Sequence, residues 1–140
     1  MKWKHIYLAG IIDGGGTITI NRHSRDSKGQ WHLKPLLRVS DRNKELVDYL
    51  VRNFGGSCIE CRQKGHKTIY KWSVHGIKPI NEILRHICPR LIVKVQQANV
   101  LIAFTNSRRK AISADHRSPY SEADVGYYSI IRRLNVRRCQ

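Results

Sequence analysis

The spacing of apolar positions divides the first third of the chain into one helix and two strands. Between positions 4 and 13 apolar residues recur at helical spacing, and the three glycines that follow are typical of a helix end. From Thr17 the period changes to two, so that Ile18 and Ile20 face one way and polar residues the other. A second alternating segment, 31–40, follows the polar loop 22–30, and the two segments predict a long hairpin.

The rest of the chain is predicted to form a helix, a second hairpin and three further helices. Residues 41–56 have helical spacing, with Asp41 or Asn43 as the cap and two glycines as the stop. A second hairpin is predicted from strands at 57–63 and 68–75. Further helices are predicted over 76–88, 91–110 and 121–134. Hairpins separated by helices favour an α+β fold with an antiparallel sheet and helices on one face, and we expect residues 1–140 to form a single domain.

The charge of the chain points to a polyanionic partner. Twenty-six Lys and Arg stand against ten Asp and Glu, a formal net charge of +16, and the basic residues are spread along the whole sequence. No apolar run approaches the roughly 18 residues of a membrane-spanning helix. We therefore expect nucleic acid rather than a membrane as the partner.

The strand face opposite the predicted core is mostly basic or hydrogen-bonding. An ordinary solvated sheet face is one interpretation, but the near lack of carboxylates favours a DNA-binding platform. A two-stranded ribbon fits the major groove, where Arg and Lys can read guanine and Asn can read adenine. The residues predicted on this face are Thr19, Asn21, His23, Arg25, His32, Lys34, Arg38, Glu60, Arg62, Lys64, Lys71 and Ser73.

Cys58 and Cys61 form a Cys-x-x-Cys pair followed by His66 and His75, which raises the possibility of a zinc site. The pair falls on a predicted strand, where positions three apart point to opposite faces, and no second cysteine pair with suitable spacing follows. We therefore expect reduced cysteines in an intracellular protein, cytoplasmic or organellar, with no small-molecule cofactor.

The junction "YLAGIIDGGGTI" carries the most specific signal. A phosphate-binding glycine loop follows a strand and opens a helix, whereas these glycines close a helix and open a strand. The stretch resembles the signature of the LAGLIDADG homing endonucleases, whose domains share the predicted αββαββα order. "LRVSDRNKELVDYLVRNFGG", "GIKPINEIL" and "LIVKVQQANVLI" extend the resemblance over most of the chain, the final helix least. It implies a saddle-shaped antiparallel sheet on double-stranded DNA.

In that family the signature helix packs against its counterpart from a second domain. Because this chain has one signature, the resemblance implies a homodimer on a long, nearly palindromic site. Small Ala9 and Gly10 would allow close approach of the two helices, and Asp13 would bond across the interface or cap the helix. The residues expected in the interface are Leu8, Ala9, Ile11, Ile12 and Asp13.

The resemblance also implies Mg²⁺-assisted phosphodiester hydrolysis, with Ca²⁺ or Mn²⁺ able to occupy the same site. Aligned with the family, Asp13 falls on the first acid of the signature and Gly15 on the second, which would bind the metal when it is Asp. The backbone carbonyl of Gly14 aligns with a further metal contact. Since Gly15 has no side chain to bind a cation, we expect DNA binding with little or no cleavage.

Lys94 in "LIVKVQQ" matches the family's active-site lysine, although a lysine at this point could also snorkel along an apolar helix. Gln96 and Gln97 are weaker candidates. The family's water-positioning residue falls near Ser40 or Asp41. The basic clusters at 108–110, 132–133 and 137–138 are interpreted as phosphate contacts.

Three functions agree with these features: a homing endonuclease of intron or intein type, a maturase that helps a group I intron splice, and a non-cleaving DNA-binding regulator. A maturase or a regulator would not need the missing acid. Gly15 itself has two explanations, a deliberate Asp-to-Gly change or a natural loss of cleavage.

Overall fold

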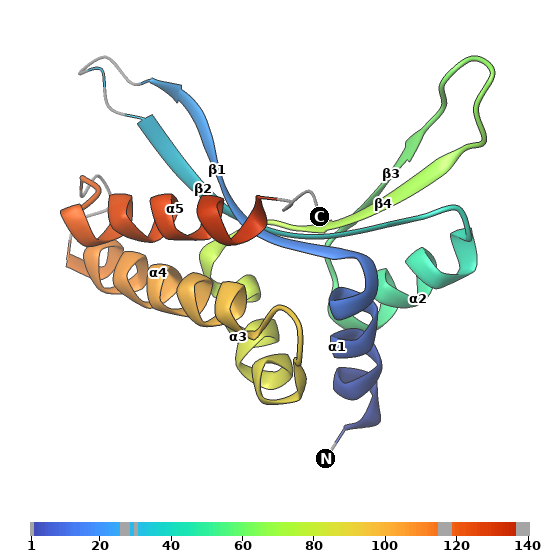
Figure 1. Ribbon diagram of the computed structural model, residues 1–140, viewed down its shortest axis with the longest axis horizontal. Helices are drawn as coiled ribbons and strands as arrows, with labels where there is room; N and C mark the ends of the chain where they lie inside the picture. Colours follow the sequence, from blue (N-terminus) through green and yellow to red (C-terminus); the bar gives the residue numbers. More distant parts are fainter. Residues whose placement is uncertain (1, 26–28, 30, 115–118, 137–140) are drawn as a thin grey trace.

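The computed structural model describes residues 2–25, 29, 31–114 and 119–136. Its elements follow the predicted order (Figure 1): α1 Trp3–Gly15, β1 Gly16–Arg25, β2 Trp31–Asp41, α2 Lys44–Phe54, β3 Ser57–Cys61, β4 Ile69–Val74, α3 Ile77–Ile87, the 3₁₀ turn η1 Cys88–Arg90, α4 Val95–Ala114 and α5 Glu122–Asn135. None of these helices has the length and apolar character required to cross a bilayer.

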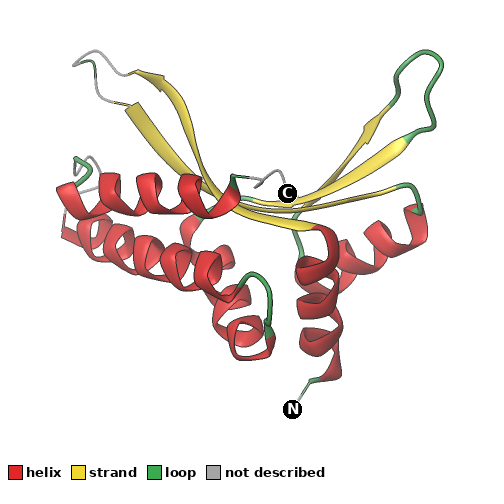
Figure 2. Ribbon diagram, in the orientation of Figure 1, coloured by secondary structure: helices red, strands yellow, loops and turns green. Residues whose placement is uncertain are grey.

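The four strands form one antiparallel sheet in the order β1-β2-β4-β3. All the helices lie on one side of the sheet, and the outer ends of the two hairpins curve away from them (Figure 2). The other side, here called the open face, is the hollow of a saddle. The predicted α+β fold, with a saddle-shaped antiparallel sheet and helices on one face, is confirmed.

The register of the strands assigns each residue to a face. Ile18 pairs with Leu37, and both are fully buried against the helices in the hydrophobic core. Trp72 of β4 is buried in the same layer, and its indole N–H donates to the carbonyl of Gly55 at 2.8 Å. The alternation read from the sequence therefore places most apolar residues of β1, β2 and β4 beneath the sheet, whereas Leu36 and Ile69 lie on the open face.

The structure changes one predicted boundary, the end of the first strand, and decides which residue caps α2. β1 continues to Arg25, so the loop between the first two strands is shorter than the predicted 22–30. Asn43, not Asp41, is the N-cap of α2: its side-chain oxygen accepts from the N–H of Glu45 at 2.9 Å. The carboxylate of Asp41 instead accepts from the N–H of Asn43 at 2.7 Å, which fixes the turn that leads into the cap.

A buried ion pair joins α4 to α5. Arg108 Nη1 lies 3.4 Å from Asp124 Oδ2, and the side chains are 7% and 1% exposed. Asp124 also forms a capping box with Ser121 at the start of α5. The guanidinium of Arg108 stacks 4.2 Å from the ring of Tyr120. The interpretation of Arg108 as a phosphate contact is therefore wrong, because its guanidinium is buried and paired with Asp124. The predicted phosphate contacts at 137–138 lie outside the described residues.

Gly16 is required by packing at the junction of α1 and β1. A Cβ at this position would lie 2.8 Å from both Cα and Cδ1 of Ile12, which is fully buried. At Gly15, by contrast, no atom beyond the adjoining residues and the backbone of the helix itself lies within 4 Å of a Cβ. Only the third glycine of the run is thus forced by contact with the core.

We expect Gly16→Ala to lower the free energy of unfolding by about 1–3 kcal/mol, because the added methyl group overpacks the junction against Ile12. Urea unfolding monitored by tryptophan fluorescence would measure the change. Gly15→Ala is the matched control and should leave stability nearly unchanged. Equal losses in the two variants would contradict the assignment of the tight contact to Gly16 alone.

Candidate active site

The end of α1 opens into a cleft of about 530 Å³ between the sheet and the last helix. The cleft brings together Gly14, Gly15 and Lys94, three residues that sequence analysis placed in one site. It is completed by side chains from the first strand, the start of α4 and the end of α5. The lining residues are Gly14, Gly15, Gly16, Thr17, Thr19, Lys94, Gln97, Leu134, Asn135 and Val136.

Asp13 binds the entry to α4. Its Oδ2 accepts from the N–H of Ile92 at 2.7 Å, and its Oδ1 accepts from the N–H groups of Val93 and Lys94 at 3.1 and 3.0 Å. These amides point back at the carboxylate, and α4 begins only at Val95, so the prediction of a helix from position 91 is wrong. Asp13 does cap a helix, but it caps α4 of its own chain, and both of its oxygens are occupied.

Lys94 is held beside the cleft by α1. Its Nζ donates to the backbone carbonyl of Ile12 at 2.9 Å, and Lys94 directly precedes α4 instead of lying along an apolar helix face. Burial lowers the pKa of the Lys94 amine, and the nearby Asp13 carboxylate opposes that shift. The lysine therefore presents a partly desolvated amine at a fixed place instead of snorkelling along a helix.

The residues at the cleft do not make a complete site for a hard cation. Mg²⁺ and Ca²⁺ need several oxygen ligands, normally with at least one carboxylate. Gly15 has no side chain, and both oxygens of Asp13 already accept backbone hydrogen bonds. Within the described ranges, no group of three or more His, Cys, Asp or Glu residues could hold a metal ion. The carbonyl of Gly14 remains as a candidate ligand without an acidic partner.

Ser40 and Asp41 lie apart from this cleft. They line a separate hollow of about 410 Å³ with Arg42 and Ile69 at the end of β2. Ser40 pairs with Lys71 on the open face, whereas the Asp41 side chain is engaged in the turn before α2. Within one chain the structure does not bring these two candidates together with Lys94, and their water-positioning role stays a prediction.

The open face carries most of the residues predicted for it. Asn21 pairs with Lys34, and His23 pairs with His32, so these four side chains share one side of the first hairpin. Thr17, which sequence analysis did not select, pairs with Arg38 on the same face. The alternation, which begins at Thr17, already implied this position. Lys64 is exposed in the second turn, and the side chain of Arg25 lies outside the described part.

Ser73 lies on the open face but is only 2% exposed. Its hydroxyl accepts from Nε of Arg38 at 3.5 Å. The prediction of a direct contact from Ser73 is therefore corrected: its side chain is covered, and it orients Arg38, which remains partly accessible together with Lys71.

Glu60 is on the wrong face for its predicted role. It pairs with Tyr70, two residues from the buried Trp72, and so points to the helix side. Nε of Arg62, just beyond β3, lies 2.6 Å from Glu60 Oε1 and bonds to it. Polarity misled the prediction, because β3 is short and its charged residue lies on the helix side near the end of the strand, beyond the core.

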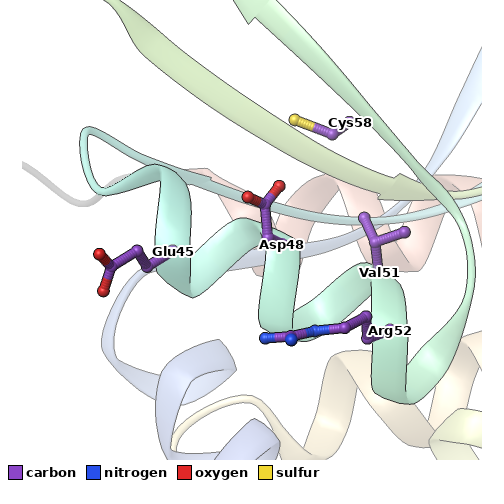
Figure 3. A pocket seen from close by; sticks show the side chains of 5 residues that line it. All are labelled: Glu45, Asp48, Val51, Arg52 and Cys58. Atoms are coloured by element: carbon purple, nitrogen blue, oxygen red, sulfur yellow. The ribbon is translucent and has the colours of Figure 1, made fainter.

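The two cysteines of the Cys-x-x-Cys pair point to opposite faces, as predicted. Cys58 pairs with Trp72 and faces α2, where it lines a pocket with Glu45, Asp48, Val51 and Arg52 (Figure 3). Cys61 pairs with Ile69 on the open face. The open face of this hairpin therefore carries Ile59, Cys61 and Ile69, which sequence analysis did not select.

The outer side of α1 differs from the predicted dimer contact. Leu8, Ala9 and Ile12 are at most 1% exposed and belong to the core of their own chain, so their side chains are not available to a partner. Ile11 is partly buried against the same core. The prediction selected the inward side of the helix; its exposed side carries Trp3, Ile6, Tyr7, Gly10 and Gly14.

A comparison with protein families decides the identity of this arrangement. The model of the LAGLIDADG endonucleases matches residues 8–104, from the signature helix into α4. The chain belongs to the LAGLIDADG endonuclease family.

Known proteins that resemble this chain include the intron-encoded DNA endonuclease aI3 of Saccharomyces cerevisiae, which is 31% identical over 83 residues. That match spans 58% of this chain and 19% of the yeast protein. Among solved structures, an archaeal intron-encoded homing endonuclease, I-Vdi141I, complexed with DNA, has a TM-score of 0.76 at 16% identity, covering 99% of this chain and 87% of that one.

The homing endonuclease I-CvuI, in complex with its target, has a TM-score of 0.72 at 19% identity and covers 96% of this chain and 83% of that one. At such low identities the structural matches establish the LAGLIDADG fold. The residues of the cleft have to be judged on their own chemistry.

In this chain we expect Asp13→Ala to lower the free energy of unfolding by about 1.5–3 kcal/mol, since the three amides that lead into α4 lose a charged acceptor. Asp13→Asn keeps one acceptor oxygen and should lose less. Amide hydrogen exchange measured by NMR should quicken at Ile92, Val93 and Lys94. Unchanged exchange at these three amides in Asp13→Ala would contradict the capping role.

Proposed function

We propose that this chain is a site-specific binder of double-stranded DNA, a homing endonuclease of intron or intein type whose cleavage is largely lost. The observation that carries this proposal is a saddle-shaped open face whose paired strand positions, in the part of the chain described, include no carboxylate. A concave basic surface suits the phosphates at its rims and the base edges in the major groove.

Two strand pairs supply base-reading groups. Asn21 opposite Lys34 offers an amide and an ammonium, and Arg38, oriented by Ser73, offers a fork of donors suited to guanine. The net charge of +16 supplies a sequence-independent attraction to DNA. I-CvuI in complex with its target and I-Vdi141I complexed with DNA have the same fold, which supports DNA as the ligand of this chain.

The cleft is suited to holding a phosphate more than to cutting one. A bound Mg²⁺ would polarise the phosphate and activate a water molecule when its ligands are complete. Here the acidic ligand is missing at Gly15, so what remains is the amine of Lys94 beside the cleft and the hydrogen-bonding groups of Thr19, Gln97 and Asn135. These groups can bind and orient a phosphodiester without a resident metal ligand set.

Gly15→Asp should restore cleavage, because the space around position 15 accepts a side chain. With a duplex first selected for binding to the unmodified chain, we expect Mg²⁺-dependent cutting to rise by about 100-fold or more, since several kcal/mol of charge stabilisation is regained. Gly15→Asn is the matched control, equal in size but uncharged. Gel analysis of both strands gives the rates.

If Gly15→Asp binds the selected duplex as tightly as before and cuts it no faster than Gly15→Asn, the endonuclease assignment fails. Two other roles in the same family then remain, and both suit a chain without the acid. Faster splicing of the host intron would identify a maturase. DNA binding without any effect on splicing would identify a regulator.

A homodimer is proposed through the outer side of α1. Ile6 and Tyr7 are 43% and 46% exposed, and Ile92 and Val93, tied to the end of α1 through Asp13, are 85% and 66% exposed. Gly10 lies on the same side of the helix and would let a partner helix approach closely. A second copy applied here by two-fold symmetry would cover this apolar strip and place two open faces side by side.

Gly10→Arg should convert dimers to monomers in sedimentation velocity, because the new side chain points into the helix-helix contact. Within the chain no atom beyond the adjoining residues and the backbone of α1 lies within 4 Å of a Cβ at Gly10, so the fold should be retained, as far-UV circular dichroism would verify. Gly126→Arg on α5, equally open, is the control. A dimer that persists in Gly10→Arg would place the interface elsewhere.

A further inference from the structure

The open face is not uniform: its second hairpin carries an apolar patch. Ile59 pairs with Lys71, and Cys61 pairs with Ile69, so all four side chains point to the open side. Ile59 is 54% exposed and Ile69 is 36% exposed. The first hairpin presents polar pairs on the same face, such as Asn21 with Lys34. The two hairpins therefore offer a partner different chemistry.

In the part of the chain that the structure describes, no helix covers this patch, because the helices lie on the other side of the sheet (Figure 2). Ile59 and Ile69 expose apolar surface on neighbouring strands, and a ligand that buried this surface would gain hydrophobic free energy. The charged residues around the patch restrict what that ligand can be. Lys71 lies between the isoleucines and Arg38 on the open face, and Lys64 is exposed in the adjoining turn. The partner must combine apolar groups with negative charge.

The major groove of DNA has this combination. Its rims are phosphates, and the C5-methyl group of thymine is the apolar group among the base edges that it displays. A protein partner would need acidic side chains placed around an apolar centre, and the basic character of the whole open face extends well beyond the patch. Charge complementarity thus favours duplex DNA as the occupant.

We propose that the β3–β4 hairpin selects thymine through its methyl group, with Ile59 and Ile69 as the contacting side chains. This rests on the proposed function, namely that the open face binds double-stranded DNA. The target is then read in two ways: by hydrogen bonds under the β1–β2 hairpin and by apolar contact under β3–β4. Bases under β3–β4 are discriminated by the presence of a methyl group.

Uracil in place of thymine tests the proposal, because it removes only the methyl group. With the full chain and a duplex selected for binding, we expect affinity to fall about fourfold or more for each contacted thymine replaced by deoxyuridine. Ile59→Ser combined with Ile69→Thr should abolish the difference between thymine and uracil, whereas Ile59→Val should retain it. Replacements under β1–β2 should have little effect.

The two cysteines show independently whether the hairpin lies on the DNA. In a Cys88→Ser, Cys139→Ser background, maleimide can label Cys61 on the open face and Cys58 on the helix side above α2 (Figure 3). DNA binding should slow labelling of Cys61 and leave labelling of Cys58 unchanged. Cys58 is thus an internal control three residues away.

Two results would overturn the inference while leaving DNA binding intact: tight binding with Cys61 still fully reactive, or protection of Cys61 with uracil tolerated at every position under β3–β4. Failure of the chain to bind any selected duplex would remove the proposed function, and this inference with it. Protection of Cys61 together with thymine-to-uracil discrimination that disappears in the isoleucine double variant would establish the methyl contact.

Discussion

The carboxylate of Asp13 is the point on which the arrangement of the site depends. The first amides of a helix have no partners within the helix, and a negative charge at that end is favoured by the helix dipole. Asp13 places a negative charge at this end of α4 and accepts from the three amides that lead into it, the last being that of Lys94, directly before the helix. In return Lys94, from the start of α4, donates to a carbonyl near the end of α1. The end of α1 and the start of α4 are thereby joined by hydrogen bonds that each segment both donates and accepts.

This reciprocal contact explains how position 15 can vary without damage to the fold. The signature's first acid is structural here, and Gly16 is held by its contact with Ile12. A Cβ at Gly15, between them, would meet no atom of the described residues within 4 Å beyond its own helix backbone and its neighbours. The scaffold of the cleft is maintained by residues on either side of position 15. Residues fixed by their contacts and a position that packing leaves open therefore lie next to each other in one short segment.

Much of the fold could be predicted from local patterns, because the periods of 3.6 and 2 are set by the backbone and visible over each element. The failures have a common physical origin in contacts that are distant in sequence. The start of α4 depends on Asp13, about 80 residues earlier, and the burial of Arg108 depends on Asp124 in another helix. Neither partner is visible from the spacing of apolar residues.

The buried side of an element was hardest to predict where its two sides have similar residues. α1 is apolar almost all round, so periodicity could not separate the buried Leu8 and Ile12 from the exposed Ile6 and Tyr7. β3 has five residues, and its one acid lies on the helix side, so polarity gave the wrong face for Glu60. The resemblance to the family, in contrast, placed Gly14, Gly15 and Lys94 in one site, and the structure brings these three residues to one cleft.

The contact between α5 and the first strand has a consequence for solubility. β1 is an edge of the sheet, and a bare strand edge invites another chain to add to it. Nδ2 of Asn135, the last residue of α5, donates to the carbonyl of Ile18 at 2.9 Å, and so occupies an acceptor that an incoming strand would use. The final helix therefore makes the β1 edge less open to the addition of a further strand.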